Sequence, residues 1–244
     1  MIIVDSRNLN FREINEQIKL AAQKSKYINL INVNGQRYIG TGLSSSVNIT
    51  IEGLPGNDLA AFLNGPRITV NGNGQDAIAN TMNAGEVIIH GMAGDTAGYA
   101  MRGGSVYISG NAGYRVGIHM KEYKSSIPAI IIGNKAGDFL GEYMAGGIVA
   151  VLGLNLGKGD SIVGNYCGTG MHGGVIYVRG HVGNHQLGAE VVRKEMKEND
   201  YKKLEPLLRK FCSYFKNDYK DIVKGPFTKL VSVNKRPYGS LYAY

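Results

Sequence analysis

The stretch Met101–Gly113, MRGGSVYISGNAG, decides the fold because it recurs along the chain, in several places at an interval of 19 residues. Its copies share the pattern Met-x-Gly-Gly-x-Φ-x-Φ-x-Gly or a part of it, where Φ is an aliphatic residue. They lie at 82–94, 130–137, 144–153 and 171–183, with two weaker copies that end at Gly53 and Gly72. A fixed period of this length is typical of a solenoid, in which each repeat stacks on the next.

The two Φ positions of each copy share one face of a strand, because side chains alternate along a strand with a period of two. Both positions are β-branched and aliphatic in all seven copies: Ile49 and Ile51, Ile68 and Val70, Val87 and Ile89, Val106 and Ile108, Ile130 and Ile132, Val149 and Val151, Ile176 and Val178. The residues between them are mixed: Thr50, Thr69, Ile88, Tyr107, Ile131, Ala150 and Tyr177. This pattern predicts one strand per rung, with each Ile/Val pair stacked on the next.

Glycine punctuates the repeat. The chain has 35 Gly, nearly all of them between residues 35 and 188. After the strand they follow a spacing of x2 and then x3, as in Gly91, Gly94 and Gly98, and again in Gly110, Gly113 and Gly117. We expect sharp corners there, where Gly permits a positive φ or the close approach of rungs about 4.8 Å apart. Inside helices, each Gly would cost about 1 kcal/mol.

The predicted fold class is all-β: a right-handed, single-stranded parallel β-helix of about seven rungs with helical caps. Right-handedness follows from the general preference of parallel crossovers. We expect a helix–strand cap at 1–46, the β-helix at 47–188 and a helical, aromatic tail at 189–244. Insertions interrupt the repeat at 119–128 and 154–166, and insertions in a solenoid project from its surface.

Both ends of the predicted solenoid need a cover, because unpaired strand edges recruit other chains. Apolar spacing predicts a helix at 10–24, a strand at 27–33 and a second, charged helix at Glu190–Phe215. The aromatic stretch Phe227–Tyr244, together with the 154–166 insertion, is the expected docking surface for other chains. Truncation after Val223 is therefore expected to leave the β-helix folded and to weaken assembly.

Composition and charge indicate a soluble protein. The sequence shows no signal-peptide pattern and no apolar run of membrane-spanning length, so we expect a cytoplasmic location and no membrane partner. The cysteines, Cys167 and Cys212, fit neither a disulfide framework nor a zinc cluster. Residues 189–244 hold 13 of the 27 Lys and Arg. These alternate with acidic residues, which favours a solvated helical face over a nucleic-acid-binding patch.

Candidate cofactor loops and metal ligands are weak. The Gly runs lead into the next strand, whereas a phosphate loop needs a following helix, and Lys158 in GKGD is followed by Gly where a nucleotide-binding loop has Ser or Thr. Zinc requires three or four converging ligands. Only the last two of the histidines are close in sequence: His90, His119, His172, His181 and His185. We therefore predict no cofactor and no metal.

Catalytic candidates are weak as well. Four carboxylates could line one surface, as in pectate-degrading β-helices: Asp95, Asp138, Glu142 and Asp160. Asp95 and Asp138, however, occupy one phase of the repeat, in GDTAG and GDFLG, which favours a structural role at a corner. Cys167 has no His at a sequence spacing that would indicate a catalytic Cys–His pair. No catalytic residue is predicted.

Several ordered motifs resemble the GXGXG domain of glutamate synthase, particularly the form that exists as a free-standing subunit in archaea and some bacteria. The resemblance runs from about residue 2 to 192, with FTKLVSVN near the end similar to the closing segment of the family. The motifs are GQRYIG (35–40), ANTM (79–82), MRGG (101–104), GYRVGIHMK (113–121), FLGEYMAGG (139–147) and GTGMHGG (168–174).

This resemblance implies a β-helix without catalytic residues that joins two other parts of the enzyme. Those parts are a glutamine amidotransferase and an FMN- and iron–sulfur-containing synthase, which together transfer the glutamine amide nitrogen to 2-oxoglutarate. The C subunit of formylmethanofuran dehydrogenase has the same rungs and is the alternative; a stand-alone β-helix enzyme acting on polysaccharide is a third. GQRYIG and GEYMAGG favour glutamate synthase. Self-association into a homo-oligomer stays open.

Overall fold

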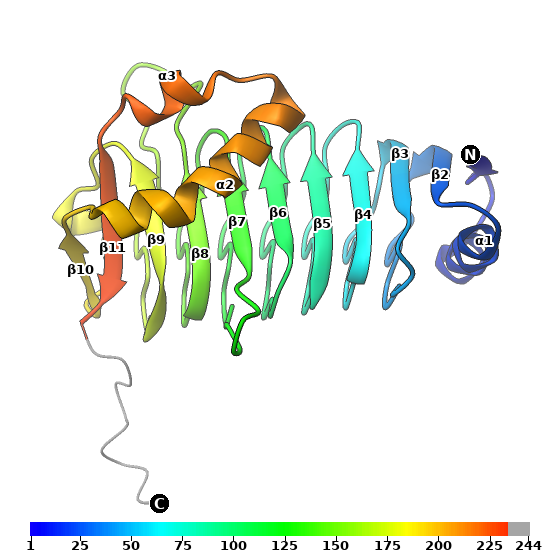
Figure 1. The fold of residues 1–244 in the computed structure, drawn as a ribbon, viewed down its shortest axis with the longest axis horizontal. Helices are drawn as coiled ribbons and strands as arrows, with labels where there is room; N and C mark the ends of the chain where they lie inside the picture. Colours follow the sequence, from blue (N-terminus) through cyan, green and yellow to red (C-terminus); the bar gives the residue numbers. More distant parts are fainter. Residues whose placement is uncertain (234–244) are drawn as a thin grey trace, which may run out of the picture.

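The computed structural model describes residues 1–233, and its strands form one long sheet. Eleven strands lie side by side in the order β1-β2-β3-β4-β5-β6-β7-β8-β9-β11-β10, as Figure 1 shows. The seven repeat strands are β3 (Asn48–Leu54), β4 (Asn64–Val70), β5 (Ala84–Ile89), β6 (Ser105–Ile108), β7 (Ala129–Ile132), β8 (Ala145–Val151) and β9 (Gly173–Arg179). Each pairs in parallel with the next. The predicted parallel β-helix is confirmed.

The register of these strands is the one that the repeat predicts. Val87 pairs with Val106 and Ile89 with Ile108, and the same two positions pair through all seven rungs. Every side chain of the two columns is at most 1 % exposed. Stacked β-branched side chains fill the interior of the coil, and burial of about 1.5–3 kcal/mol for each makes this column the main source of stability.

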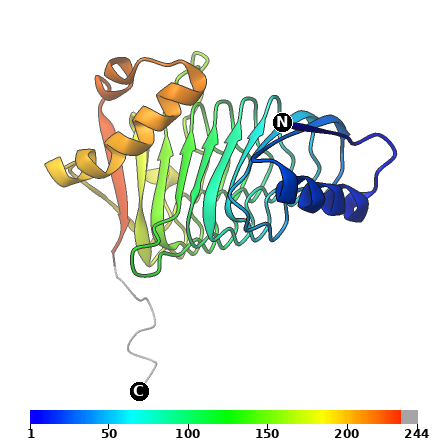
Figure 2. The same cartoon turned by 45° about the vertical axis from the view of Figure 1, so that its right-hand side comes forward.

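The N-terminal segment lengthens the same sheet. Strands β1 (Ile2–Asp5) and β2 (Tyr27–Asn34) pair in parallel with each other, and β2 pairs in parallel with β3. Helix α1 (Phe11–Lys24) covers the end of the coil with Ile14, Ile18 and Ala21, as Figures 1 and 2 show. Asn10 begins this helix by accepting hydrogen bonds from its first turn in a capping box. The helix predicted at 10–24 is confirmed.

The corners contain a feature that the glycine pattern only partly reveals. Each rung has three alternate residues with positive φ, of which Arg115, Gly117 and His119 are one set and Phe139, Gly141 and Tyr143 the next. The middle residue is always Gly or Ala because it faces the core: a Cβ on Gly141 would lie 2.6 Å from Ile176 Cδ1. The outer two point away from the core, and in these two sets they carry large side chains.

The C-terminal segment differs from the sequence prediction. A helix over Glu190–Phe215 is wrong for its first part, because Val191–Lys194 form strand β10 and helix α2 spans Glu198–Phe215. Beyond the short helix α3 (Tyr219–Val223), residues Phe227–Ser232 form strand β11, which inserts antiparallel between β9 and β10. Gln186 and its neighbours form a short 3-10 helix, Asn184–Gln186. The pairing of β11 with β9 and β10 joins residues far apart in sequence, and local apolar spacing does not detect such a contact.

Helix α2 creates a second hydrophobic core outside the coil. Its Leu204, Leu208 and Phe211 pack on the outward-facing side chains of the middle and last rungs, among them Tyr107 and Tyr177. Figure 1 shows the helix crossing strands β9 to β6. At one end of the contact, Glu86 accepts hydrogen bonds from Tyr214, Arg67 and Lys210. The helical cap is thus fastened along the flank of the solenoid.

Asp200, 6 % exposed, fastens the other end of α2. Its carboxylate accepts hydrogen bonds from Tyr177 Oη (2.7 Å), Lys229 Nζ (2.9 Å) and the Lys197 backbone N (2.9 Å). Burial alone would raise the pKa of Asp200, but the Lys229 ammonium, the backbone N–H and the Tyr177 hydroxyl outweigh it and hold the pKa below 3.8. The stabilisation is therefore present above pH 4 and lost as the pH falls through the depressed pKa.

We expect Asp200→Asn to destabilise the C-terminal cap by about 1–3 kcal/mol at neutral pH, because Lys229 loses its charged partner in a nearly buried site. Urea unfolding at several pH values measures this. The difference between wild type and variant should shrink in acid. A constant difference down to strongly acidic pH would show that ionised Asp200 does not stabilise the cap. Glu198→Gln, in an exposed pair with Lys202, is the control and should change little.

Candidate interaction surfaces

The corner aspartates flagged in the sequence cap the next rung. Asp95 Oδ1 accepts a hydrogen bond from the Tyr114 backbone N at 2.8 Å, and Asp138 Oδ1 accepts one from the Asn165 N at 2.7 Å. The rung therefore needs Gly beside each cap: a Cβ on Gly113 would lie 2.1 Å from Asp95 Oδ1. The structural role predicted for Asp95 and Asp138 is confirmed.

The other two flagged carboxylates each have a cationic partner. Glu142 Oε2 lies 2.9 Å from Arg115 Nε, and Asp160 Oδ2 lies 3.1 Å from Lys135 Nζ. Between residues 1 and 233, no group of three or more His, Cys, Asp or Glu side chains is arranged to hold a metal ion. Each of the four flagged carboxylates thus has a hydrogen-bonding or ion-pair partner of its own.

The two cysteines are buried thiols, and neither forms a disulfide. Cys167 is completely covered, and burial raises its pKa to about 12. Burial also raises the pKa of Cys212. A thiol must ionise to act as a nucleophile, so at neutral pH both side chains fill space in the core.

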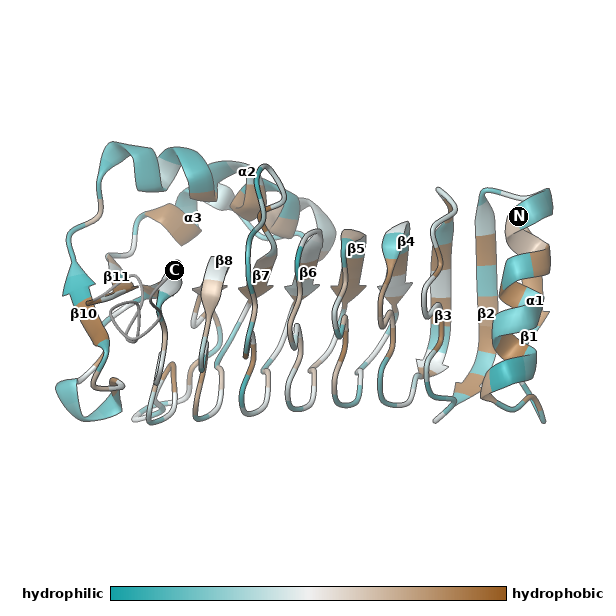
Figure 3. Cartoon of the chain, turned by 90° about the horizontal axis from the view of Figure 1, so that it is seen from below, coloured by the Kyte–Doolittle hydropathy of each residue, from teal (hydrophilic) through white to brown (hydrophobic). Residues whose placement is uncertain are grey.

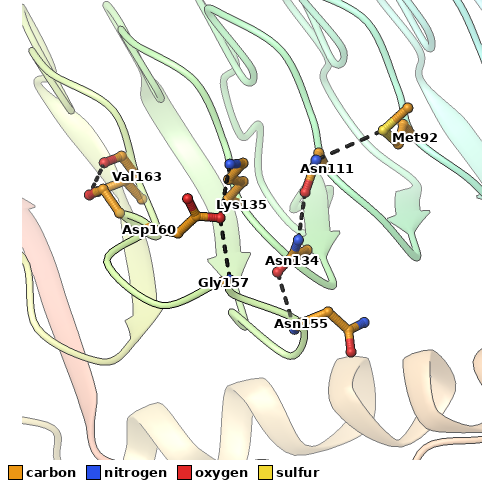
Figure 4. A network of polar contacts seen from close by, with 9 residues as sticks. Met92, Asn111, Asn134, Lys135, Asn155, Gly157, Asp160 and Val163 are labelled. Carbon is orange, nitrogen blue, oxygen red and sulfur yellow. Dashed lines mark hydrogen bonds and ion pairs between the residues drawn. The ribbon is translucent and has the colours of Figure 1, made fainter.

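The 154–166 insertion turns its apolar residues inward. Leu156 packs against the inner core and Ile162 is 5 % exposed, while the outer part, Gly157–Ser161, is exposed and polar. Figure 4 shows how the insertion is anchored: Asn155 N donates to Asn134 Oδ1 at 3.1 Å, and Asp160 meets Lys135. Most of the apolar residues that made this insertion a candidate docking surface are thus covered, but its last residue, Tyr166, is 56 % exposed.

The first part of the aromatic tail, Phe227–Ser232, is strand β11 and belongs to the sheet itself. Leu230 is fully buried and β11 pairs with β9, so truncation after Val223 would strip the last rung of its neighbouring strand. The expectation that this truncation leaves the β-helix intact is corrected on that ground. Residues 234–244, the rest of the predicted docking tail, lie outside the described residues.

A second surface, which includes Tyr166 of the 154–166 insertion, carries exposed aromatic side chains on successive corners. Its members stack on one another: His119 on Tyr143 at 5.3 Å between ring centroids, with Tyr99 edge-on to His119 at 5.9 Å. Beside them, Phe139 stacks on Tyr166 at 5.0 Å, and the Arg115 guanidinium lies 4.9 Å from the Phe139 ring. We call this surface the aromatic ridge; it consists of Tyr99, Arg115, His119, Phe139, Tyr143 and Tyr166.

The backbone of the corners places the ridge. Arg115, His119, Phe139, Tyr143 and Tyr166 are all outer residues of the positive-φ sets. Their side chains therefore repeat at two positions of successive rungs, with Arg115, Phe139 and Tyr166 in one row and His119 and Tyr143 in the other. Tyr99 is 40 %, Tyr143 47 % and Tyr166 56 % exposed. Tyr and Arg are the residue types that dominate protein–protein contacts, so the ridge is chemically suited to bind another protein.

The tight fit at the ridge depends on glycine as well. A Cβ on Gly170, the next outer residue along the row from Tyr143, would lie 2.3 Å from Tyr143 Cδ1. The Tyr143 ring is therefore held between His119 and the bare backbone of the following rung.

No helix among residues 1–233 combines the length and the apolarity needed to cross a membrane.

The architecture defines the class first: this chain is a glycine-rich parallel β-solenoid protein with one α-helix over its N-terminal end and another along its flank. Comparison with known proteins then identifies the family. The family model described as the GXGXG motif matches residues 12–233, and the chain belongs to that family. The resemblance to the GXGXG domain of glutamate synthase is confirmed at the level of the family. A protein of Methanocaldococcus jannaschii, described as uncharacterized, is 46 % identical, with 99 % of this chain and 96 % of that protein aligned.

Proposed function

We propose that this chain is the non-catalytic β-helix subunit of a glutamate synthase complex in the cytoplasm. In this proposal it holds a glutamine amidotransferase subunit and an FMN- and iron–sulfur-containing synthase subunit in one assembly. The complex serves glutamate biosynthesis and ammonia assimilation, and the chain itself binds no cofactor.

The observation that carries the proposal is the extent of the family match. The GXGXG model covers residues 12–233 of 244, so the β-helix accounts for nearly the whole chain. A glutamate synthase also needs a site that releases ammonia from glutamine and a site that reduces the imine formed with 2-oxoglutarate. In this proposal, those two sites lie outside the solenoid and its caps, in the catalytic parts of the complex.

Two further observations support a scaffold role. The flagged carboxylates and thiols are committed to capping, ion pairing or packing. The aromatic ridge, in contrast, has no role in the folding core, since none of its residues belongs to either hydrophobic cluster. We take the ridge to be the contact surface for one of the two catalytic subunits.

Purification from the native cell tests the assembly. We expect the chain to co-purify with an amidotransferase and an FMN-binding subunit, and to be colourless and inactive towards glutamine when prepared alone. Molybdenum or tungsten pterin subunits in their place would establish the formylmethanofuran dehydrogenase alternative. A flavin spectrum from the isolated chain, or cleavage of acidic polysaccharide by it, would contradict the scaffold role.

The ridge is tested with Tyr143→Ala/Tyr166→Ala. Loss of two exposed aromatic anchors is expected to weaken binding of one catalytic subunit by about 30- to 700-fold, since each contact of this kind contributes about 1–2 kcal/mol. Calorimetry or surface plasmon resonance with each subunit in turn identifies which one binds. Tyr201→Ala, on the exposed face of α2, removes a Tyr that is 42 % exposed and serves as the matched control. Unchanged binding of both subunits by the double variant would exclude the ridge.

A further inference from the structure

Four Asn-Gly pairs occur in the sequence: Asn34–Gly35, Asn64–Gly65, Asn71–Gly72 and Asn73–Gly74. In such a pair the backbone nitrogen of Gly can attack the side-chain amide of Asn, because Gly has no Cβ that shields its nitrogen or limits its backbone rotation. Asn is one of the thermolabile residues of proteins. The folded structure decides which of the four pairs can react.

Two of the pairs are restrained by a backbone hydrogen bond of the Gly N–H. Gly35 N donates to Leu54 O at 2.7 Å, and Gly74 N donates to Met92 O at 2.8 Å. A third pair, Asn64–Gly65, lies inside strand β4, which pairs with β3 on one side and β5 on the other. A bonded Gly nitrogen must first lose its hydrogen bond before it can attack the amide beside it.

Gly72 differs, because its N–H donates no hydrogen bond within residues 1–233. The corresponding glycines of later rungs do: Gly91 N donates to Gly72 O and Gly110 N to Gly91 O, both at 2.9 Å. The spacing explains the difference. A Cβ on Gly91 would lie 2.9 Å from Gly72 O, whereas one on Gly72 would lie 3.6 Å from Gly53 O. The Gly72 nitrogen is thus unpaired and has room around it.

The side chain of Asn71 is exposed and has one restraint. Its Nδ2 donates to Oε1 of Glu52 at 2.6 Å, and the Glu52 side chain is exposed as well. This contact joins neighbouring rungs, since Glu52 belongs to β3 and Asn71 follows β4, which lie side by side in Figure 3. Release of an exposed hydrogen bond costs little. The amide carbon of Asn71 is then free to approach Gly72 N.

We propose that Asn71 is a site of spontaneous modification, at which asparagine becomes aspartate and isoaspartate ahead of the other three pairs. A bond forms between Gly72 N and Asn71 Cγ, and the Cγ–Nδ2 bond breaks. Nδ2 leaves as ammonia with the proton of the Gly72 N–H, so that a cyclic imide remains. Water then opens the imide: attack at the side-chain carbonyl gives aspartate, and attack at the main-chain carbonyl gives isoaspartate. No oxidant or reductant takes part, and this inference does not rest on the proposed enzyme complex.

The modification would replace a contact between rungs with a repulsion. A carboxylate at position 71 cannot donate to Glu52, and the two negative charges repel each other. The isoaspartate form also adds one carbon to the backbone next to Gly72, whose O accepts the hydrogen bond from Gly91 N. The first rungs of the solenoid are therefore the part that the modification weakens.

The test is mass spectrometry of the full-length protein after incubation at neutral pH in isotope-labelled water. Asn71 is expected to exchange its amide NH2 for a labelled OH and to give two chromatographically separate forms, and peptide fragmentation locates the change. Asn34 and Asn73 are internal controls. They should react about fivefold more slowly or less, which corresponds to the roughly 1 kcal/mol needed to break one backbone hydrogen bond. In urea the difference between the sites should disappear.

Two variants separate the attacking nitrogen from the amide that it attacks. Gly72→Ala shields the nitrogen without a clash and is expected to slow the reaction at Asn71 about tenfold. Glu52→Ala releases the amide and is expected to speed it about two- to tenfold. Glu16→Ala, on the exposed face of α1, is the control and should change nothing.

The folded wild type decides the outcome. Equal rates at Asn71, Asn34 and Asn73 would overturn the proposal, because the fold would then not select the site. An unchanged Asn71 in folded protein, while the unfolded chain reacts in urea, would overturn it too. A Gly72→Ala variant that reacts as fast as the wild type would show that the unpaired Gly72 nitrogen is not the attacking group.

Discussion

Gly113→Val is expected to be the most damaging single substitution in the solenoid. A Cβ at this position would lie 2.1 Å from Asp95 Oδ1 and 2.9 Å from the Asp95 backbone N. The carboxylate would have to move away from the Tyr114 N–H that it caps, and the two rungs would have to separate. We expect a loss of about 3 kcal/mol or more, from overpacking together with the broken hydrogen bond. Thermal melting measures it as a fall of about 6–12 °C.

Gly72 provides the control within the same solenoid. The nearest atom to a Cβ there is Gly53 O at 3.6 Å, an ordinary contact, and its φ is not positive. The pair Gly113→Ala and Gly72→Ala isolates the effect of the Cβ alone, and only the first should lower the melting temperature markedly. Equal melting temperatures for Gly113→Val and wild type would mean that close approach of rungs does not explain the glycine pattern.

Ile108→Ala is the second substitution with a large expected effect. Ile108 is fully buried in a middle rung and lies in register between Ile89 and Ile132. Truncation removes apolar surface and leaves a cavity between rungs held in place by the backbone ladder, which prevents collapse of the site. The expected loss in free energy of unfolding is about 2–5 kcal/mol, measured as a lower midpoint in urea.

Ile127→Ala is the matched control, because Ile127 is 49 % exposed outside the column. Its expected effect lies within about 0.5 kcal/mol. If Ile108→Ala and Ile127→Ala shifted the urea midpoint equally, the stacked column would not be the main stabilising element. Hydrogen exchange at the neighbouring strands β5 and β7 locates the damage, since solenoid rungs depend mainly on their nearest neighbours.

The solenoid could be predicted from sequence because its information is local and repeated. In each rung a pair of aliphatic residues indicates the position of the strand, and the spacing between the pairs indicates the register between rungs. The seven strands and their alignment therefore agree with the repeat. β10 and β11 have no such repetition. β11 pairs Leu230 with Ile176, across a separation that local periodicity does not report.

One usable signal lay in the residues between the paired aliphatic positions. Thr50 and Thr69 are polar, whereas later rungs hold Ile88, Tyr107 and Ile131. The change marks where an outer cover begins, and Ile88, Tyr107 and Ile131 are indeed part of the core formed with α2. The start of apolar residues on the outward face thus predicts which rungs a flanking helix covers.

The aromatic ridge could not be predicted from the sequence, because it depends on an unusual backbone conformation. Its side chains gather because Arg115, His119 and Tyr143 adopt positive φ. Non-glycine residues rarely do so, so the sequence drew attention only to the Gly at the centre of each set. The surrounding hydrogen-bonded turns, such as Ile118 N to Arg115 O and Met120 N to Gly117 O, hold these residues in place once the coil has formed.

Because every rung adds one strand to the same sheet, the number of rungs sets the length of the molecule. Adjacent strands lie about 4.8 Å apart, so duplication or loss of one 19-residue unit would move α1 and α2 apart or together by that fixed step. The surfaces at either end would keep their chemistry while the distance between them changed. A protein built in this way can adjust the separation of two bound objects in whole increments, by changes to its middle alone.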